Sequence, residues 1–189
     1  MSSALASKQS LEFVERGQPL DLAAVYRANV QLVARWATRL GGPEIDVEDV
    51  VQDVFISVQK GLPHFRGEAS LTTWLYRITE NAVTRGRRKL RWRRWLGGNA
   101  QDVAGHLPAP GRSASETVES QQAQARVYRA LNAMKEKYRN LLILFELEEM
   151  SGEEIAELTG TRTATVWVQL HRARAEFLKR LEALPEEES

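Results

Sequence analysis

Few side chains in this sequence are suited to nucleophilic, acid–base or metal chemistry. The chain contains no cysteine, which excludes disulfides, thiol nucleophiles and cysteine-bound zinc. His64 and His171 have no serine, aspartate or second histidine at a useful spacing, and His106 lies in a Gly- and Pro-rich stretch without a partner nearby. We therefore expect no catalytic residues, no cofactor and no metal, and we predict that the protein is not an enzyme.

A group of carboxylates stands at the start of the stretch IDVEDVVQDVFISVQKGLPHF. Asp46 suits the cap of a helix, and acidic residues in the following turn favour the helix dipole without any further function. Carboxylates one turn apart, such as Asp49 and Asp53, could instead hold a hard metal ion, but nothing else supplies the oxygen ligands that such an ion needs. An acidic face could also dock on a basic protein surface. The spacing alone leaves these three interpretations open.

The strongest signal is a basic and aromatic stretch from Phe65 to Trp95, FRGEASLTTWLYRITENAVTRGRRKLRWRRW. From residue 77 onward its cations are opposed only by Glu80, and they are Arg77, Arg85, Arg87, Arg88, Lys89, Arg91, Arg93 and Arg94. Its interleaved aromatic residues are Trp74, Tyr76, Trp92 and Trp95. Bases stack on aromatic rings and phosphates are neutralised by Arg and Lys, so the stretch predicts contact with a nucleic-acid strand, particularly an opened one. The alternative is a solvated basic helix with tryptophans in the core.

Three helices are predicted to position these groups. Apolar residues recur at three- and four-residue spacing from Leu20 to Leu40, and Gly41 ends that helix. A second helix follows the Asp46 cap with a buried stripe of valines, and a third begins near Thr72. Packed antiparallel, they would form a compact all-α domain. Residues 1–19 show no periodicity and are interpreted as a flexible leader.

The composition changes after this domain. Residues 96–121 are rich in Gly, Pro, Ala and Ser without an apolar face, which predicts a linker. The helical pattern then resumes, and Ser151 with Glu154 forms a capping box in front of a short helix. Gly160 permits the left-handed turn that ends this helix. A further helix follows, so the segment predicts a helix-turn-helix.

The second helix of such a motif enters the major groove of DNA by its N-terminal part. The candidate contact residues there are Thr163, Thr165, Val168, Gln169 and Arg172. Gln can pair with an adenine edge, Arg with guanine or phosphate, and Val or a Thr methyl with the thymine methyl group.

Length and composition agree with two small domains. The chain has 189 residues, of which 43% are hydrophobic, and its formal net charge is +1. We find no secretion signal and no apolar run long enough to cross a bilayer, so we expect a cytoplasmic protein without membrane insertion.

Two helical domains on a linker, one aromatic and basic and one with a helix-turn-helix, resemble the sigma factors of bacterial RNA polymerase. The resemblance is to the extracytoplasmic-function (ECF) branch, which keeps conserved regions two and four. It is carried by DVEDVVQDVF (46–55), FRGEASLTTWLYRITEN (65–81) and EEMSGEEIAELTGTRTATVWVQLHRARAEF (148–177). With flanking helices these motifs cover residues 20–95 as region two and 122–184 as region four, and an acidic tail over 185–189 follows.

The resemblance implies roles for residues of the first domain. Asp49, Gln52, Asp53 and Phe55 would lie in the helix that docks on the β′ clamp helices of core RNA polymerase. The loop from Phe65 and the helix after it would recognise and open the minus-ten element of promoter DNA, with one base flipped into a pocket. The residues thereby assigned to DNA are Arg66, Thr73, Trp74, Arg77, Asn81, Arg85 and Arg88.

The resemblance also implies roles for the second domain and for partners. Region four would read the minus-thirty-five element through Thr163 to Arg174 and contact the β flap of the polymerase. Members of the branch are usually held inactive by an anti-sigma factor, and they act on no small-molecule substrate. Many relatives carry Lys, Ser and Arg where this chain has Trp167, Val168 and Gln169, so its recognition helix is more apolar.

The predicted function is therefore promoter-specific transcription initiation with core polymerase. The main alternative is a free-standing helix-turn-helix regulator that binds duplex DNA without polymerase and has little use for a melting helix. A third is a nucleic-acid-processing enzyme with a metal at Asp46, Asp49 and Asp53.

Overall fold

The computed structural model describes residues 21–96 and 114–185, with side chains from residue 120 onward in the second range. Every regular element in these ranges is a helix. The chain divides into two compact units, one within residues 1–104 and the other within residues 105–189. The predicted all-α, two-domain class is therefore confirmed. The leader over residues 1–19 lies outside the described residues.

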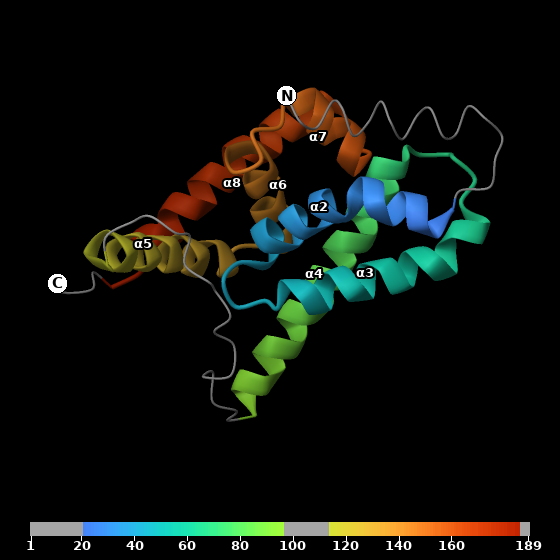
Figure 1. Cartoon of the computed structure of the whole chain (residues 1–189). Coiled ribbons are helices and arrows are strands. Elements are labelled where there is room, and N and C mark those ends of the chain that lie inside the picture. The colour runs from blue at the N-terminus through green and yellow to red at the C-terminus, as the bar shows by residue number, and fades with distance from the viewer. Residues whose placement is uncertain (1–20, 97–113, 186–189) are drawn as a thin grey trace. The chain divides into compact units, whose positions relative to one another are not determined.

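The first unit is built from α2 (Leu22–Gly41), α3 (Val47–Gly61) and α4 (Leu71–Trp95), which pack on one another (Figure 1). A short 3-10 turn, η1 (Leu62–His64), follows α3. Apolar side chains at helical spacing from all three helices fill the core, and the most deeply buried are Val33, Trp36, Leu40, Val54, Val58, Leu75 and Tyr76. Burial of these side chains holds the unit together.

Short polar side chains set where these helices begin. The Asp46 carboxylate accepts hydrogen bonds from the backbone N–H groups of Glu48 and Asp49, at 3.0 and 3.1 Å. The Ser70 hydroxyl accepts one from the Thr73 N–H at 3.1 Å. These bonds satisfy donors that have no partner within the helix. The predicted Asp46 cap is confirmed.

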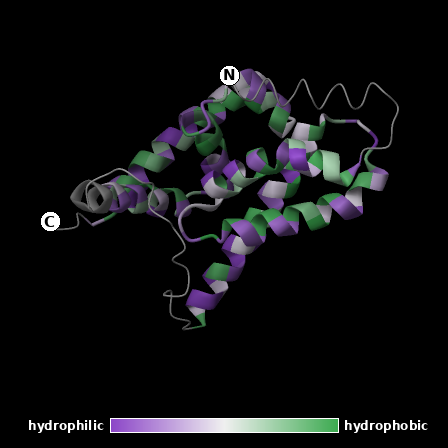
Figure 2. Cartoon of the chain, viewed as in Figure 1, coloured by the Kyte–Doolittle hydropathy of each residue, from purple (hydrophilic) through white to green (hydrophobic). Residues whose placement is uncertain are grey.

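Helix α4 continues well past the core. Its last buried side chains are Ala82 and Val83, and the residues from Arg91 to Leu96 are all exposed. This end of the helix is predominantly hydrophilic and extends away from α2 and α3 (Figure 2). The part of α4 after Val83 is therefore a basic extension that contributes little to the core.

The second unit contains α5 (Ala114–Asn132), α6 (Glu136–Glu146), α7 (Gly152–Thr159) and α8 (Thr163–Glu182). Helix α5 begins inside the stretch that the sequence predicted as linker up to residue 121. The residues from 120 to 124 are exposed, so this part of α5 has no apolar stripe by which periodicity could reveal a helix. The core comes from all four helices and includes Leu131, Ile143, Leu144, Ile155, Val166, Leu170 and Ala173.

Helices α7 and α8 form the predicted helix-turn-helix. The Ser151 hydroxyl accepts from the Glu154 N–H at 3.2 Å, and the Glu154 carboxylate accepts from the Ser151 N–H at 2.8 Å. Gly160 ends α7 at a φ of 67°, and the Thr161 N–H donates to the Ala156 carbonyl at 2.9 Å. The capping box and the glycine turn are confirmed as the sequence predicted them.

Candidate nucleic-acid and partner interfaces

The exposed side of α3 carries the polar residues that the sequence singled out. Asp49, Gln52 and Asp53 are all exposed, whereas the Asp46 carboxylate is occupied in capping the helix. Two carboxylates and an amide therefore share one stretch of surface. Such a surface suits a basic partner, because the charges remain hydrated until docking pairs them.

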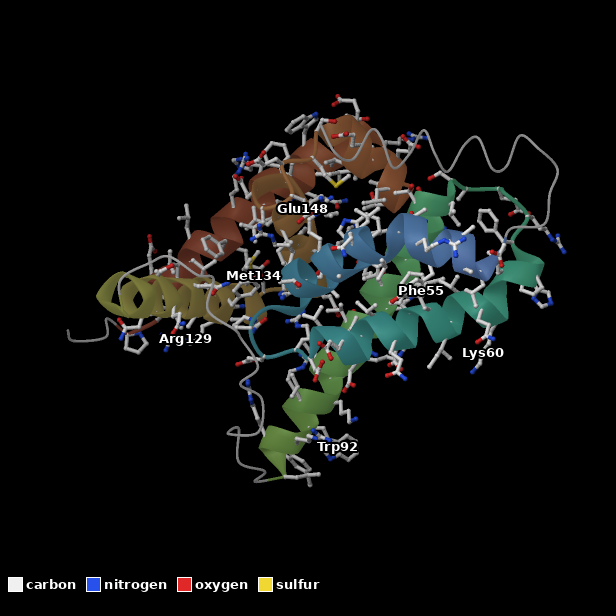
Figure 3. All side chains as sticks on the ribbon, in the orientation of Figure 1. Phe55, Lys60, Trp92, Arg129, Met134 and Glu148 are labelled. Atoms are coloured by element: carbon white, nitrogen blue, oxygen red, sulfur yellow. The ribbon has the colours of Figure 1, made fainter. Side chains whose placement is uncertain are left out.

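Phe55 does not stand on this acidic surface. Its side chain is 8% exposed and lies between α2 and α3 (Figure 3), with its ring centroid 4.6 Å from that of Tyr26. Phe55, Tyr26 and the exposed Ile56 line a groove of about 550 Å³ that also borders Gln52. Phe55 thus contributes to the core and to the groove wall beside the acidic residues.

The residues suited to metal or acid–base chemistry are dispersed. Within residues 21–96 and 114–185, no three His, Asp or Glu side chains converge as they would around a metal ion. His64 is exposed in η1 and His171 is exposed on α8. His106 lies outside the described residues.

Aromatic packing holds the loop between η1 and α4. The ring centroids of Phe65 and Trp74 are 5.0 Å apart, and the Trp74 indole lies over Gly61, where a Cβ atom would meet it at 2.8 Å. Gly67 adopts a φ of 71°, a conformation that glycine accepts without strain. The exposed Arg66 stands beside this turn. The half-buried Trp74 is therefore both a packing residue and part of the loop surface.

Thr73 is placed differently from its predicted role in DNA contact. It is 4% exposed, and its hydroxyl accepts a hydrogen bond from the Ser70 hydroxyl at 2.9 Å. Its backbone N–H is also bonded to Ser70. Thr73 consequently stabilises the start of α4 and has almost no surface to offer a ligand.

Four of the polar residues that the resemblance assigned to DNA form a row on α4. Arg77, Asn81, Arg85 and Arg88 are all exposed, and their three- and four-residue spacing places them along one side of the helix. The three guanidinium groups can neutralise a phosphate backbone, and the amide on the same side can form hydrogen bonds with a base edge.

Tyr76 belongs to the core and not to this row. It is 1% exposed, and its ring meets that of Trp36 edge to face at a centroid distance of 5.4 Å. Its hydroxyl has no hydrogen-bond partner within the described residues. Burial raises the pKa of Tyr76 well above its usual range, and the Glu80 carboxylate raises it further. Tyr76 therefore remains neutral and packs the helices together.

The far end of α4 exposes the remaining aromatic residues. Trp92 and Trp95 are 64% and 81% exposed, and the Trp92 side chain lies on the part of α4 beyond the core (Figure 3). Arg94 forms an ion pair with Glu44 at the turn before α3. The aromatic and basic stretch is thus divided into a packed half and a solvent-facing half.

The N-terminal half of α8 presents most of the predicted DNA contacts. Thr165, Val168 and Arg172 are exposed, whereas Thr163 and Gln169 are half-buried at the sides of the helix. The arrangement agrees with an N-terminal half free to enter a groove.

Two residues of α8 pack against the preceding helices in a way that the sequence did not reveal. The Trp167 ring lies over Gly152 and meets Phe145 at a centroid distance of 5.6 Å. Arg174 bonds through Nε to the Glu146 carboxylate at 2.9 Å and lies 5.0 Å above the Phe145 ring. Arg174, predicted to bind DNA, is therefore directed toward α6.

Comparisons with known proteins agree with this arrangement. The family model described as Sigma-70 region 2 matches residues 25–93, and that described as Sigma-70, region 4 matches residues 124–177. The RNA polymerase sigma factor YlaC of Bacillus subtilis is 31% identical, with 87% of this chain and 94% of that protein covered. The ECF RNA polymerase sigma-E factor of Escherichia coli K12 is 31% identical, with 92% and 93% covered. The chain belongs to the ECF sigma factors of bacterial RNA polymerase.

Two solved structures share the fold of this ECF sigma factor. CnrH, in a complex with the cytosolic domain of CnrY, is 23% identical with a TM-score of 0.57 and covers 96% of this chain and 97% of its own. The sigma factor RpoE of Bartonella quintana, in a complex with the anti-sigma factor NepR, is 22% identical with a TM-score of 0.54, covering 85% and 96%.

Region four of this sigma factor has an apolar groove. It has a volume of about 390 Å³ and lies between α5, α6 and α8. Its lining includes Val127, Leu131, Leu142, Phe177 and the exposed Leu178, with Arg174 and Glu146 among its polar residues. The sequence analysis did not predict this groove. No helix within residues 21–96 or 114–185 combines the length and apolar character needed to span a membrane.

Proposed function

We propose that this sigma factor docks on core polymerase through α3, opens the minus-ten element with α4 and reads the minus-thirty-five element with α8. One observation carries the proposal: a single three-helix unit exposes an acidic helix face and a row of cations, as a factor that joins polymerase to DNA requires. The sigma factor acts in the cytoplasm and contributes binding and no catalytic chemistry of its own.

Docking on the β′ clamp helices involves Asp49, Gln52 and Asp53. Opposite charge on the polymerase speeds the encounter, and the groove beside Gln52 offers apolar contact once the surfaces meet. Phe55 shapes this groove from below, so it acts through packing.

Opening of the minus-ten element involves Arg66, Trp74 and the polar row on α4. Unstacking a base step costs a few kcal/mol, which contacts to the opened strand must offset. The arginines neutralise its phosphates, and the half-exposed Trp74 beside Phe65 offers a ring for an extruded base. Thr73 holds the helix start that positions these groups.

Region four binds duplex DNA with the N-terminal half of α8 and a polymerase segment with its apolar groove. The groove between α5, α6 and α8 suits an amphipathic helix, and we assign it to the β flap. An anti-sigma factor would hold the protein inactive by covering these docking surfaces; the similar sigma factor RpoE forms a complex with the anti-sigma factor NepR.

The test is reconstitution with purified core polymerase and transcription from genomic DNA. We expect co-elution and transcripts that begin at defined sites. The double variant Asp49→Asn, Asp53→Asn should lose co-elution and transcription together. Glu157→Gln removes one negative charge at an exposed position of α7 and should retain both activities. Duplex binding without polymerase association would overturn the proposal.

A further inference from the structure

The recognition helix exposes methyl groups where base readout takes place. In the first turns of α8, Ala164, Thr165 and Val168 are exposed, and Val168 is 52% exposed. Val166 and Leu170 are buried at 1% each and fix the opposite side of the helix in the core. At 100° per residue, Ala164 and Val168 lie near the centre of the outward face and Thr165 lies at its edge.

The polar side chains near this face are placed at its margins. Gln169 is half-buried, and Arg174 is bonded to Glu146 on α6. Arg162 precedes the first turn, and His171 and Arg172 follow in the third. The centre of the outward face over the first two turns therefore offers no guanidinium or amide for bidentate pairing with a base.

Trp167 strengthens this arrangement. Its ring is 45% exposed and packs on Gly152 and Phe145, so it widens the apolar surface beside Val168. The apolar group that base pairs display in the major groove is the 5-methyl group of thymine. Methyl groups of Ala and Thr side chains make apolar contacts with it.

We propose that α8 reads its element by contact of Ala164, Thr165 and Val168 with thymine 5-methyl groups. This inference rests on the proposed role of region four in reading the minus-thirty-five element. Arg162 and Arg172, at either end of the methyl face, bind the flanking phosphates and set the register. The element accordingly contains thymines at the central positions that the helix covers.

The test uses the reconstituted holoenzyme on a promoter found by genomic transcription. Each thymine of the footprinted minus-thirty-five element is replaced singly by deoxyuridine, which removes the methyl group and keeps the base pairing. A contacted position should bind roughly fourfold more weakly, the effect of one buried methyl-sized group. Deoxyuridine outside the footprint should change nothing.

Protein variants identify the contacting side chains. Ala164→Gly should abolish the thymine preference at one position, and Val168→Ala, which keeps the Cβ and removes both γ-methyl groups, should reduce the preference at another. Ala175→Gly is the matched control for Ala164→Gly, because Ala175 is also exposed but lies in the C-terminal half of α8, and it should keep the full preference. The thymine preference is the ratio of the affinities of one protein variant for thymine-containing and deoxyuridine-containing DNA. A change in the stability of that variant affects both affinities equally and cancels in the ratio.

The outcomes separate the two proposals. A footprint that is indifferent to deoxyuridine, or a thymine preference that is unchanged in both variants, would overturn the methyl readout and leave the role of region four intact. Polymerase-dependent initiation without any footprint on that element would overturn the role of region four itself.

Discussion

At the residue scale, two positions require glycine because an indole ring packs directly over each of them. A Cβ on Gly61 would lie 2.8 Å from Trp74, and one on Gly152 would lie 2.6 Å from Trp167. Both distances are shorter than a carbon contact allows. Each glycine therefore provides the space for an aromatic side chain that its own helix does not carry.

We predict that Gly152→Ala destabilises the second unit by about 1 kcal/mol, because the added methyl displaces the Trp167 ring. In a Trp167→Ala background the same change should be neutral or stabilising, since alanine is the better helix former. Chemical denaturation of the four proteins of this cycle measures the coupling. Equal effects of Gly152→Ala in both backgrounds would contradict the contact.

A second prediction concerns the buried hydroxyl of Tyr76. Tyr76→Phe should raise the free energy of unfolding by about 1 kcal/mol at neutral pH, because it removes a polar group without a partner in the described residues. The pKa of Tyr76 is raised by burial, so the stability of the native protein is complete below pH ~10 and falls above it as the unfolded tyrosine ionises. The advantage of the variant should therefore grow with pH above ~10. A difference that stays constant between pH 7 and 11 would contradict this assignment.

At the element scale, α4 performs two tasks along one axis. Its first part packs against α2 and α3, and its far end exposes Trp92 and Trp95 among cations. In α8 the separation is between two sides of the helix, because Thr165 and Val168 are exposed whereas Val166 and Leu170 are buried. Trp167 and Arg174 pack this helix against α6 and α7. The exposed residues that we propose to bind DNA are therefore positioned by the packed residues of the same helices.

We predict that Arg88, Lys89 and Arg91, all exposed on the extension, bind DNA phosphates. The triple alanine variant should weaken promoter binding by the holoenzyme, and it should reduce the slope of log K against log salt by about 0.9 per lost contact. Binding measured over a series of salt concentrations gives the slope. Weaker binding with an unchanged slope would show that the residues do not neutralise phosphates.

At the scale of the whole molecule, each unit has its own core. Leu75 is fully buried in the first unit, and Leu170 is 1% exposed in the second. The two surfaces that we propose to read DNA therefore lie on separate units, each of which can engage its own element of one promoter.

We predict that Leu75→Ala destabilises the first unit by about 2–5 kcal/mol through the cavity that it leaves, with little effect on the second unit. Residue-resolved hydrogen exchange distinguishes the two. Protection should fall in α2, α3 and α4 and persist in α6, α7 and α8. Loss of protection throughout the chain would show that the units unfold together.

The sequence alone determined the features that depend on a few neighbouring residues. The Asp46 cap, the Ser151 and Glu154 capping box and the Gly160 turn each follow from local hydrogen bonding and backbone preference. Helical periodicity likewise identified the main core, whereas the ordered motifs were identified by resemblance to a known family.

Tertiary structure alone decided which members of a pattern face inward. Tyr76 and Trp92 look alike in the basic stretch, yet one contacts Trp36 in the core and the other lies beyond the last helix that could cover it. Arg174 and Arg172 are equally basic, yet only Arg174 lies close enough to Glu146 to pair with it. Periodicity gives the direction in which a side chain points from its own helix. The neighbouring helices determine how much of that helix is buried and which side chains it meets there.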